Sequence, residues 1–354
     1  MTRRVRTAGS LDPRSQSILR AVIEEYVDTA TPVGSAALVQ RYRLGVSSAT
    51  VRNILADLES AGLLTHPHTS AGRVPTDAGY RYFVESIVDN AILPPVEQLM
   101  IRHQFGQVQH ASEQWFRLAA TILAAANRTA AIVTPAKPRS AHVRRIDLVS
   151  ISNRLASLII VFREGAVRQV LVTLPDAIEQ EDLTRAAVIL DGIMAGRTAA
   201  DADRALARID ATGPIGALVE LVGRSVLAAV RDYDASPIED VFSDGLLHVM
   251  DAPEFERSEK LRRVFAALEN RSYLGALFDS IAGTTGEVQT FIGAENGPED
   301  MRDVTLVLAS YGEPSRAVGV VGVLGPTRMA YRQAIGTVRF VSGLMNELVT
   351  HIQA

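Results

Sequence analysis

A short run of polar residues has the clearest chemical potential in this chain. Arg and Asn stand next to each other at positions 52 and 53, after a series of small hydroxyl side chains. In the major groove of DNA, Arg pairs with guanine and Asn with adenine, while small neighbouring side chains permit close approach to the bases. The residues that we expect to contact DNA from this run are Ser47, Ser48, Thr50, Arg52 and Asn53.

A second set of polar residues follows in a loop rich in Pro, Gly, Ser and Thr, a composition that favours a chain reversal. Basic and hydroxyl side chains on such a hairpin could contact phosphates or a minor groove. The residues concerned are His66, His68, Thr69, Ser70 and Arg73. Candidates for contacts with the DNA backbone also occur earlier, at Ser35, Arg41 and Arg43. The two histidines lack further metal ligands nearby, so a solvated loop is favoured over a metal site.

The elements that must position these side chains form a helix-turn-helix pattern. The sequence predicts a short helix over residues 36–43, a turn at Gly45, and a second helix capped by Ser47 or Ser48. Apolar residues in the second helix have the spacing of one buried face, which leaves Arg52 and Asn53 outward. These apolar residues are Val51, Ile54, Leu55 and Leu58. Another helix is predicted after Thr76, behind the hairpin.

Two alternatives remain open for this segment. Winged domains of this kind also serve as protein-binding modules, although the order of helix, turn, capped helix and basic hairpin favours DNA. Arg3, Arg4 and Arg6 form a short basic arm before the first predicted helix. Such an arm either touches the DNA backbone or minor groove, or is a solvated terminus.

The bulk composition excludes several classes of protein. The chain has 354 residues, of which 47% are hydrophobic and 21% charged, as in globular proteins of two or three domains. Its net charge of −4 argues against non-specific coating of nucleic acids. The absence of cysteine excludes disulfides and thiolate chemistry. No signal peptide and no long apolar run is evident, so we expect a cytoplasmic protein with no membrane partner.

Beyond residue 90 the pattern changes twice. Residues 91–129 read as a helical connector. Alternating apolar and β-branched residues then predict strands over 130–134, 143–152, 155–163 and 166–174, and again over 288–292, 304–311 and 317–324. Between these sets the sequence is mainly helical. An antiparallel sheet that is interrupted and then resumed predicts an α+β domain, 130–194 and 252–354, with an inserted domain, 195–251.

Sequence motifs for catalysis are missing. The glycines at 319, 322 and 325 are not spaced as a dinucleotide fingerprint, and they end a strand at Pro326 rather than opening a helix. No nucleophile elbow, phosphate-binding loop or metal-ligand cluster is evident. We therefore expect no catalytic residues, no cofactor and no metal, and an enzyme or adaptor that has borrowed a DNA-binding fold is the less favoured interpretation.

Several long motifs resemble those of the HrcA family of heat-inducible transcription repressors. They are VSSATVRN at residues 46–53, DLESAGLL at 57–64, HPHTSAGRVP at 66–75 and GYRY at 79–82. The segments 275–278, 290–296 and 319–331 resemble the C-terminal half of that family. The resemblance therefore covers nearly the whole chain and is weakest over 195–250.

The resemblance implies a multidomain α+β fold: an N-terminal winged helix-turn-helix over 1–90, then a GAF-like domain that carries the inserted dimerisation domain. It also implies a homodimer that binds an inverted-repeat operator upstream of chaperone genes and is kept active by the GroEL chaperonin. A symmetric dimer matters because one recognition helix reads only a few base pairs. The alternative is a metabolite-responsive winged-helix regulator with a ligand site in the GAF-like domain.

Overall fold

The computed structural model describes residues 11–67, 72–86, 91–108, 112–136, 141–163, 166–235, 241–255, 258–281, 286–313 and 317–353. The chain forms two compact units. The first contains residues 1–135, 240–312 and 319–354, and the second contains 136–239 and 313–318. The fold is α+β, and every strand pairing described in it is antiparallel.

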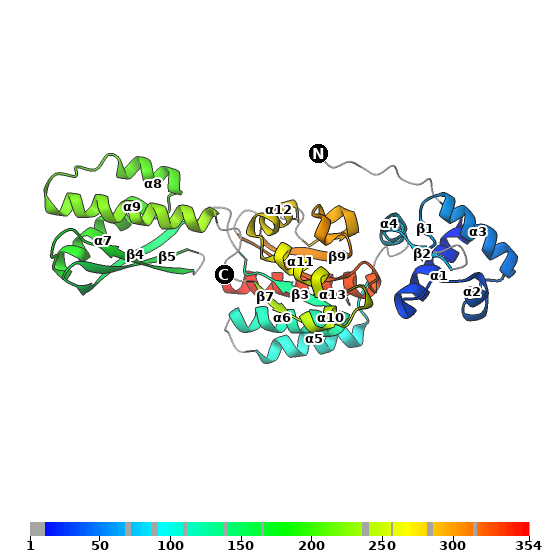
Figure 1. Ribbon diagram of the computed structural model, residues 1–354. Coiled ribbons are helices and arrows are strands. Elements are labelled where there is room, and N and C mark those ends of the chain that lie inside the picture. Colours follow the sequence, from blue (N-terminus) through cyan, green and yellow to red (C-terminus); the bar gives the residue numbers. More distant parts are fainter. Residues whose placement is uncertain are drawn as a thin grey trace. The chain divides into compact units, whose positions relative to one another are not determined.

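The first unit begins with helices gathered around a short hairpin (Figure 1). In chain order these elements are α1 (Pro13–Thr29), α2 (Ser35–Arg41), α3 (Ser48–Ser60), β1 (Leu64–Thr65), β2 (Val74–Pro75) and α4 (Asp77–Ser86). Asp12 caps α1, because its carboxylate accepts hydrogen bonds from the backbone N–H groups of Arg14 and Ser15. The helices share a core of fully buried side chains: Ile18, Leu19, Val22, Leu38, Val51 and Leu58.

The rest of the first unit is built on a sheet with the strand order β7-β3-β10-β9-β8. Its strands are β3 (Ala130–Val133), β7 (Phe242–Asp244), β8 (Val288–Ile292), β9 (Val304–Glu313) and β10 (Ala317–Pro326). Its helices are α5 (Pro95–Gln107), α6 (Ser112–Asn127), α10 (Leu246–Met250), α11 (Ser258–Glu269), α12 (Arg271–Ile281) and α13 (Tyr331–Gln353), with the 3-10 turns η1 (Pro253–Phe255), η2 (Gly293–Asn296) and η3 (Glu299–Met301). Nearly every described residue of β9 and β10 is buried, so the middle of this sheet is covered on both faces.

Tyr311 fills the middle of this sheet. Its ring occupies the space beside Gly319, where any added Cβ would overlap it. Its hydroxyl donates a hydrogen bond of 2.5 Å to the backbone oxygen of Thr134, and burial raises the pKa of that hydroxyl. A buried Tyr usually finds such a partner. The side chain therefore ties three neighbouring strands together and leaves no room for a ligand at this point.

The second unit packs a three-stranded sheet on helices. Its elements are β4 (Val143–Ser152), β5 (Leu155–Phe162), β6 (Val167–Thr173), α7 (Gln180–Met194), α8 (Ala199–Leu206) and α9 (Gly213–Ala235). The segment Gly213–Asp234 of α9 is long and apolar enough to cross a membrane by length and composition alone. However, its apolar side chains lie in the core of this unit, including Leu218, Val219, Val222 and Val226. We therefore interpret α9 as a core helix.

The division of the chain differs from the predicted one. Strands β4, β5 and β6 form a sheet of their own, and the inserted unit is 136–239 rather than 195–251. The reason is packing: the inner side chains of β4 and β5, such as Ile146 and Leu158, share a core with Leu190 and Val222 of α7 and α9. Alternation along a strand shows that one face is buried, but it does not show which element covers it.

Two further expectations need correction. Residues 91–129 were predicted to be a helical connector; they contain the helices α5 and α6, but α6 packs on β3 and β7 and buries Ala119 and Leu123 completely, so it belongs to the sheet domain. The short strand β7 lies within the block that was predicted to be helical. It pairs with β3, with Ser243 opposite Ile132. A three-residue strand is too short to show a periodic pattern in sequence.

Candidate nucleic-acid interface

Ser47 caps the helix that carries the predicted base contacts. Its backbone is extended, and its hydroxyl accepts a hydrogen bond of 3.1 Å from the backbone N–H of Thr50. The two hydroxyls of Ser47 and Thr50 also lie 2.9 Å apart. Ser48 is the first helical residue, and its hydroxyl lies 3.0 Å from that of Ser35 on α2. Ser47 is therefore the cap of α3, and the Ser35–Ser48 contact joins the two helices of the turn.

Arg52 and Asn53 lie on the exposed face of α3, close to its N-terminus. The neighbouring Val51 is fully buried, which fixes the rotation of the helix and turns the pair outward. Within the part of the chain that the structure describes, Arg52 forms no ion pair, either with Asp57 or with Glu59 of the same helix. Its guanidinium is thus available for an external partner.

Glu59, near the end of α3, holds the hairpin against the helix. One carboxylate oxygen pairs with Nδ1 of His66, and the other lies 2.7 Å from Nη2 of Arg73. The backbone of Arg73 also exchanges two hydrogen bonds with Val33, of 2.8 and 2.9 Å. These contacts fix the base of the hairpin. His68, Thr69 and Ser70, which were predicted to contact DNA from this hairpin, lie outside the described residues, as does the basic arm at Arg3, Arg4 and Arg6.

The two arginines predicted to contact the DNA backbone have different surroundings. Arg41 pairs with Glu25 at 2.9 Å and with Asp28 at 3.3 Å, which ties α2 to α1. Arg43 is exposed and forms no ion pair with any described residue. Arg43 is therefore the better candidate for a phosphate contact, and Arg41 has a structural role within the segment.

The structure brings together some of the residues that were predicted to contact DNA, and it shows a role for one further residue, Glu59. Ser35, Ser47, Ser48, Thr50, Arg52 and Asn53 gather around the start of α3. Glu59 was not predicted from the sequence, because acids on a helix surface are usually solvated. The only available signal was its place at the end of the helix, just before a basic loop. Across the described ranges, no group of His, Asp and Glu side chains is arranged to hold a metal ion.

Comparison with known proteins identifies the family. A family described as the HrcA protein C-terminal domain matches residues 113–335. The heat-inducible transcription repressor HrcA of Chloroflexus aurantiacus is 41% identical over 356 residues, covering 98% of this chain and 95% of that protein. The protein of the same name from Herpetosiphon aurantiacus is 42% identical over 341 residues, covering 96% and 95%.

A solved structure of similar fold is also found. It is the crystal structure of a hypothetical protein at 2.2 Å resolution, which aligns with a TM-score of 0.59 over 97% of this chain and 99% of that one. The two sequences are 20% identical, so the likeness concerns the fold alone. Since the full-length relatives and the C-terminal match agree, the chain belongs to the HrcA family of heat-inducible transcription repressors.

Proposed function

We propose that this protein is a cytoplasmic repressor of heat-shock chaperone operons that binds an inverted-repeat operator as a homodimer. In this proposal residues 11–86 are a winged helix-turn-helix domain, in which α3 is the recognition helix and the β1–β2 hairpin is the wing. The five-stranded sheet with its helices is the GAF-like domain. The observation that carries the proposal is the exposed Arg52, which has no ion pair among the described residues, beside Asn53 at the start of a capped helix.

The second unit is the proposed dimerisation domain. Its helices pack on one face of the three-stranded sheet, and the other face exposes apolar side chains. On β6, Val167 and Leu171 are 61% and 60% exposed, and on β4, Val149 and Ile151 are 47% and 53% exposed. Ser157 of β5 stands between Val149 and Leu171 in the sheet register, so the apolar residues share one face. Several exposed apolar side chains on one face of a sheet are typical of a surface that binds a partner.

Heat would act on this system through the fraction of folded dimer. Proteins are stable by only about 5–15 kcal/mol, so mild heating can shift a repressor from mostly bound to mostly free. Membership of the family supports a feedback in which the GroEL chaperonin restores the folded form. A repressor that refolds only with chaperonin would sense the amount of free chaperonin in the cell.

The direct test is protection of a chaperone-gene promoter by the purified full-length protein. We expect protection of an inverted repeat at low temperature, loss of protection on mild heating, and better recovery with GroEL and ATP than without them. A fragment with the repeat scrambled is the control. Equal protection of both fragments would contradict operator binding, whereas equal recovery with and without GroEL would contradict only the chaperonin step.

A separate prediction concerns Arg73 in the wing. We expect Arg73→Ala to weaken binding to all DNA sequences alike and to reduce the salt slope by about one, because one phosphate contact is lost. Sharing this guanidinium between Glu59 and a phosphate is feasible, since 25% of the side chain is exposed. The measurement is a titration of operator and unrelated DNA at several salt concentrations. An unchanged salt slope would restrict Arg73 to anchoring the hairpin.

A further inference from the structure

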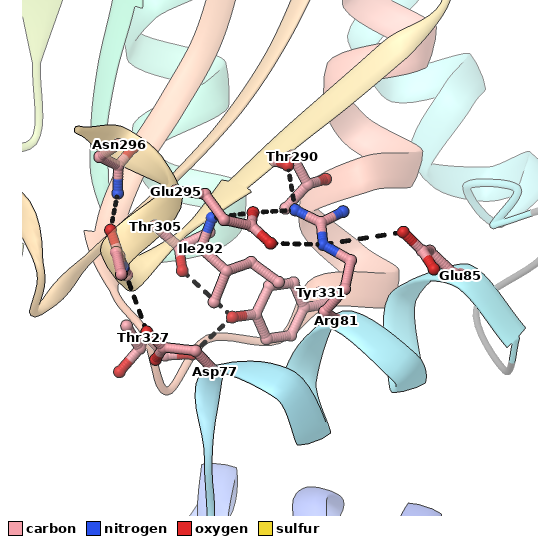
Figure 2. A network of polar contacts seen from close by, with 12 residues as sticks. Asp77, Arg81, Glu85, Thr290, Ile292, Glu295, Asn296, Thr305, Thr327 and Tyr331 are labelled. Atoms are coloured by element: carbon pink, nitrogen blue, oxygen red, sulfur yellow. Dashed lines mark hydrogen bonds and ion pairs between the residues drawn. The ribbon is translucent and has the colours of Figure 1, made fainter. Parts of the chain in front are cut away.

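The orientation of the N-terminal segment 11–86 depends on non-covalent contacts. A single covalent connection, residues 87–90, joins this segment to the rest of the described chain. Helix α4 lies against β8 and η2 of the sheet domain, and Figure 2 shows the polar contacts between them. We call these contacts, formed by Asp77 and Arg81 with residues 290–295, the α4 clamp.

Arg81 forms the centre of the α4 clamp. Its Nε donates a hydrogen bond of 2.8 Å to Oε1 of Glu295, and its Nη2 pairs with the second carboxylate oxygen. The same Nη2 donates 2.5 Å to the backbone oxygen of Thr290. Glu295 is fixed in turn, because it accepts a hydrogen bond of 2.8 Å from the backbone N–H of Ile292. A two-pronged pair of this kind sets direction as well as distance.

The ion pair of Arg81 and Glu295 is partly shielded from solvent. Only 24% of the Arg81 side chain and 34% of the Glu295 side chain are exposed. Burial alone would lower the pKa of Arg81, but its hydrogen bonds and charge interaction with Glu295 outweigh that effect and raise the pKa. Loss of either partner would leave a poorly solvated charge behind, which costs more than loss of an exposed surface pair.

A second contact lies one turn away on the same helix. The carboxylate of Asp77 accepts a hydrogen bond of 3.1 Å from the backbone N–H of Ala294. Gly293 permits this approach, since a Cβ at that position would overlap the carboxylate of Asp77. Between these polar contacts, the buried rings of Tyr80 and Tyr331 lie with their centroids 5.5 Å apart. Two polar contacts, from Asp77 and Arg81, and an aromatic contact, from Tyr80, therefore hold α4 against the sheet domain.

A separate contact joins α1 to the sheet domain. Arg328 donates a hydrogen bond of 2.6 Å from Nη1 to the backbone oxygen of Val27, near the end of α1. Its Nε donates 2.7 Å to Glu254. Two attachment points on different helices of one segment restrict both its tilt and its rotation.

We propose that Arg81 and Glu295 are positioning residues that set which half-site spacing this repressor accepts. The proposal rests on the proposed function, that is, on a dimer reading an inverted repeat. Half-sites on one face of DNA lie one helical turn apart, about 34–36 Å, so two recognition helices must be held at a matching distance. With the α4 clamp broken, these contacts would no longer fix the orientation of segment 11–86, and the dimer would tolerate several spacings.

The test uses full-length variants that break the α4 clamp from either side. Arg81→Met removes the guanidinium but keeps an extended side chain, and Glu295→Gln removes only a charge. Gly293→Ala blocks the approach of Asp77. Its matched control is Gly297→Ala, because Gly297 also has a positive φ (88°) but has open space around it. The control for Arg81→Met is Arg117→Met, which breaks an exposed pair within α6.

The measurement is the dissociation constant for operators whose half-site spacing is changed by one base pair at a time, beside a duplex with one half-site. We expect the parent protein and both controls to lose about tenfold or more in affinity away from the natural spacing. The three clamp variants should bind all spacings within about threefold of one another. Their affinity for the single half-site should equal that of the parent protein.

The spacing profiles of the variants test the positioning role of Arg81 and Glu295. A flattened profile in the clamp variants with a sharp one in the controls supports the positioning role. Uniformly weaker binding with an unchanged profile would overturn it, because the residues then only stabilise the fold. Glu295→Gln is included because its side chain is isosteric with the original and should leave the fold intact. Its melting temperature is measured alongside to check this. Failure of the parent protein to prefer the inverted repeat over a half-site would instead refute the proposed function.

Discussion

Replacement of Arg52 by alanine is expected to cost about 1–3 kcal/mol of operator binding and to remove discrimination at one base-pair position. The reason is geometric: the side chain projects from the first turns of α3 and forms no ion pair within the described residues. A lost base contact changes the ranking of DNA sequences, whereas a lost phosphate contact weakens all of them. The measurement is a competition assay over single-base operator variants at two salt concentrations.

Two control variants separate this effect from general loss of charge. Arg117→Ala removes an exposed guanidinium from α6 in the sheet domain, and it should leave both affinity and discrimination unchanged. Arg43→Ala removes the exposed charge after α2, and it should weaken all operator variants equally while lowering the salt slope by about one. If Arg52→Ala also weakens every variant equally, Arg52 is a phosphate contact and not a base reader.

The helix that carries Arg52 could be predicted because local rules suffice for it. Val51, Leu55 and Leu58 repeat with helical spacing and are all buried, and Ser47 caps the helix as its hydroxyl chemistry suggests. Ile54, predicted for the same face, is only partly buried because it lies at the edge of the apolar stripe. Neighbouring residues in the sequence thus determined which side chains face outward.

Contacts between distant residues could not be predicted in the same way. Arg81 and Glu295 are 214 positions apart, and nothing in the composition around either residue points to the other. Glu59 is close to the loop that it holds, but a carboxylate on a helix surface is most often solvated. The separate sheet of β4, β5 and β6 was missed for a related reason, since strand patterns do not specify their partners. In each case the missing information is tertiary packing.

Gly79→Ala is expected to destabilise the N-terminal segment by about 1–3 kcal/mol, as overpacking in a well-filled core usually does. Gly79 lies in the first turn of α4, where an added Cβ would overlap the backbone oxygen of Leu63. That oxygen also accepts a hydrogen bond of 3.1 Å from the backbone N–H of Thr76, so α4 cannot move away without loosening the hairpin. The measurement is thermal unfolding of the full chain, with operator binding followed in parallel.

The matched control is Gly343→Ala, in the interior of α13, where an added Cβ would have open space. Alanine is favoured over glycine in a helix by about 0.5–1 kcal/mol, so this substitution should raise the melting temperature slightly. The same helix preference applies to Gly79, which means that a lower melting temperature there must come from the close approach to Leu63. If Gly79→Ala is as stable as the parent protein, α4 does not pack on the hairpin as closely as the structure shows, and the α4 clamp would hold segment 11–86 less firmly as well.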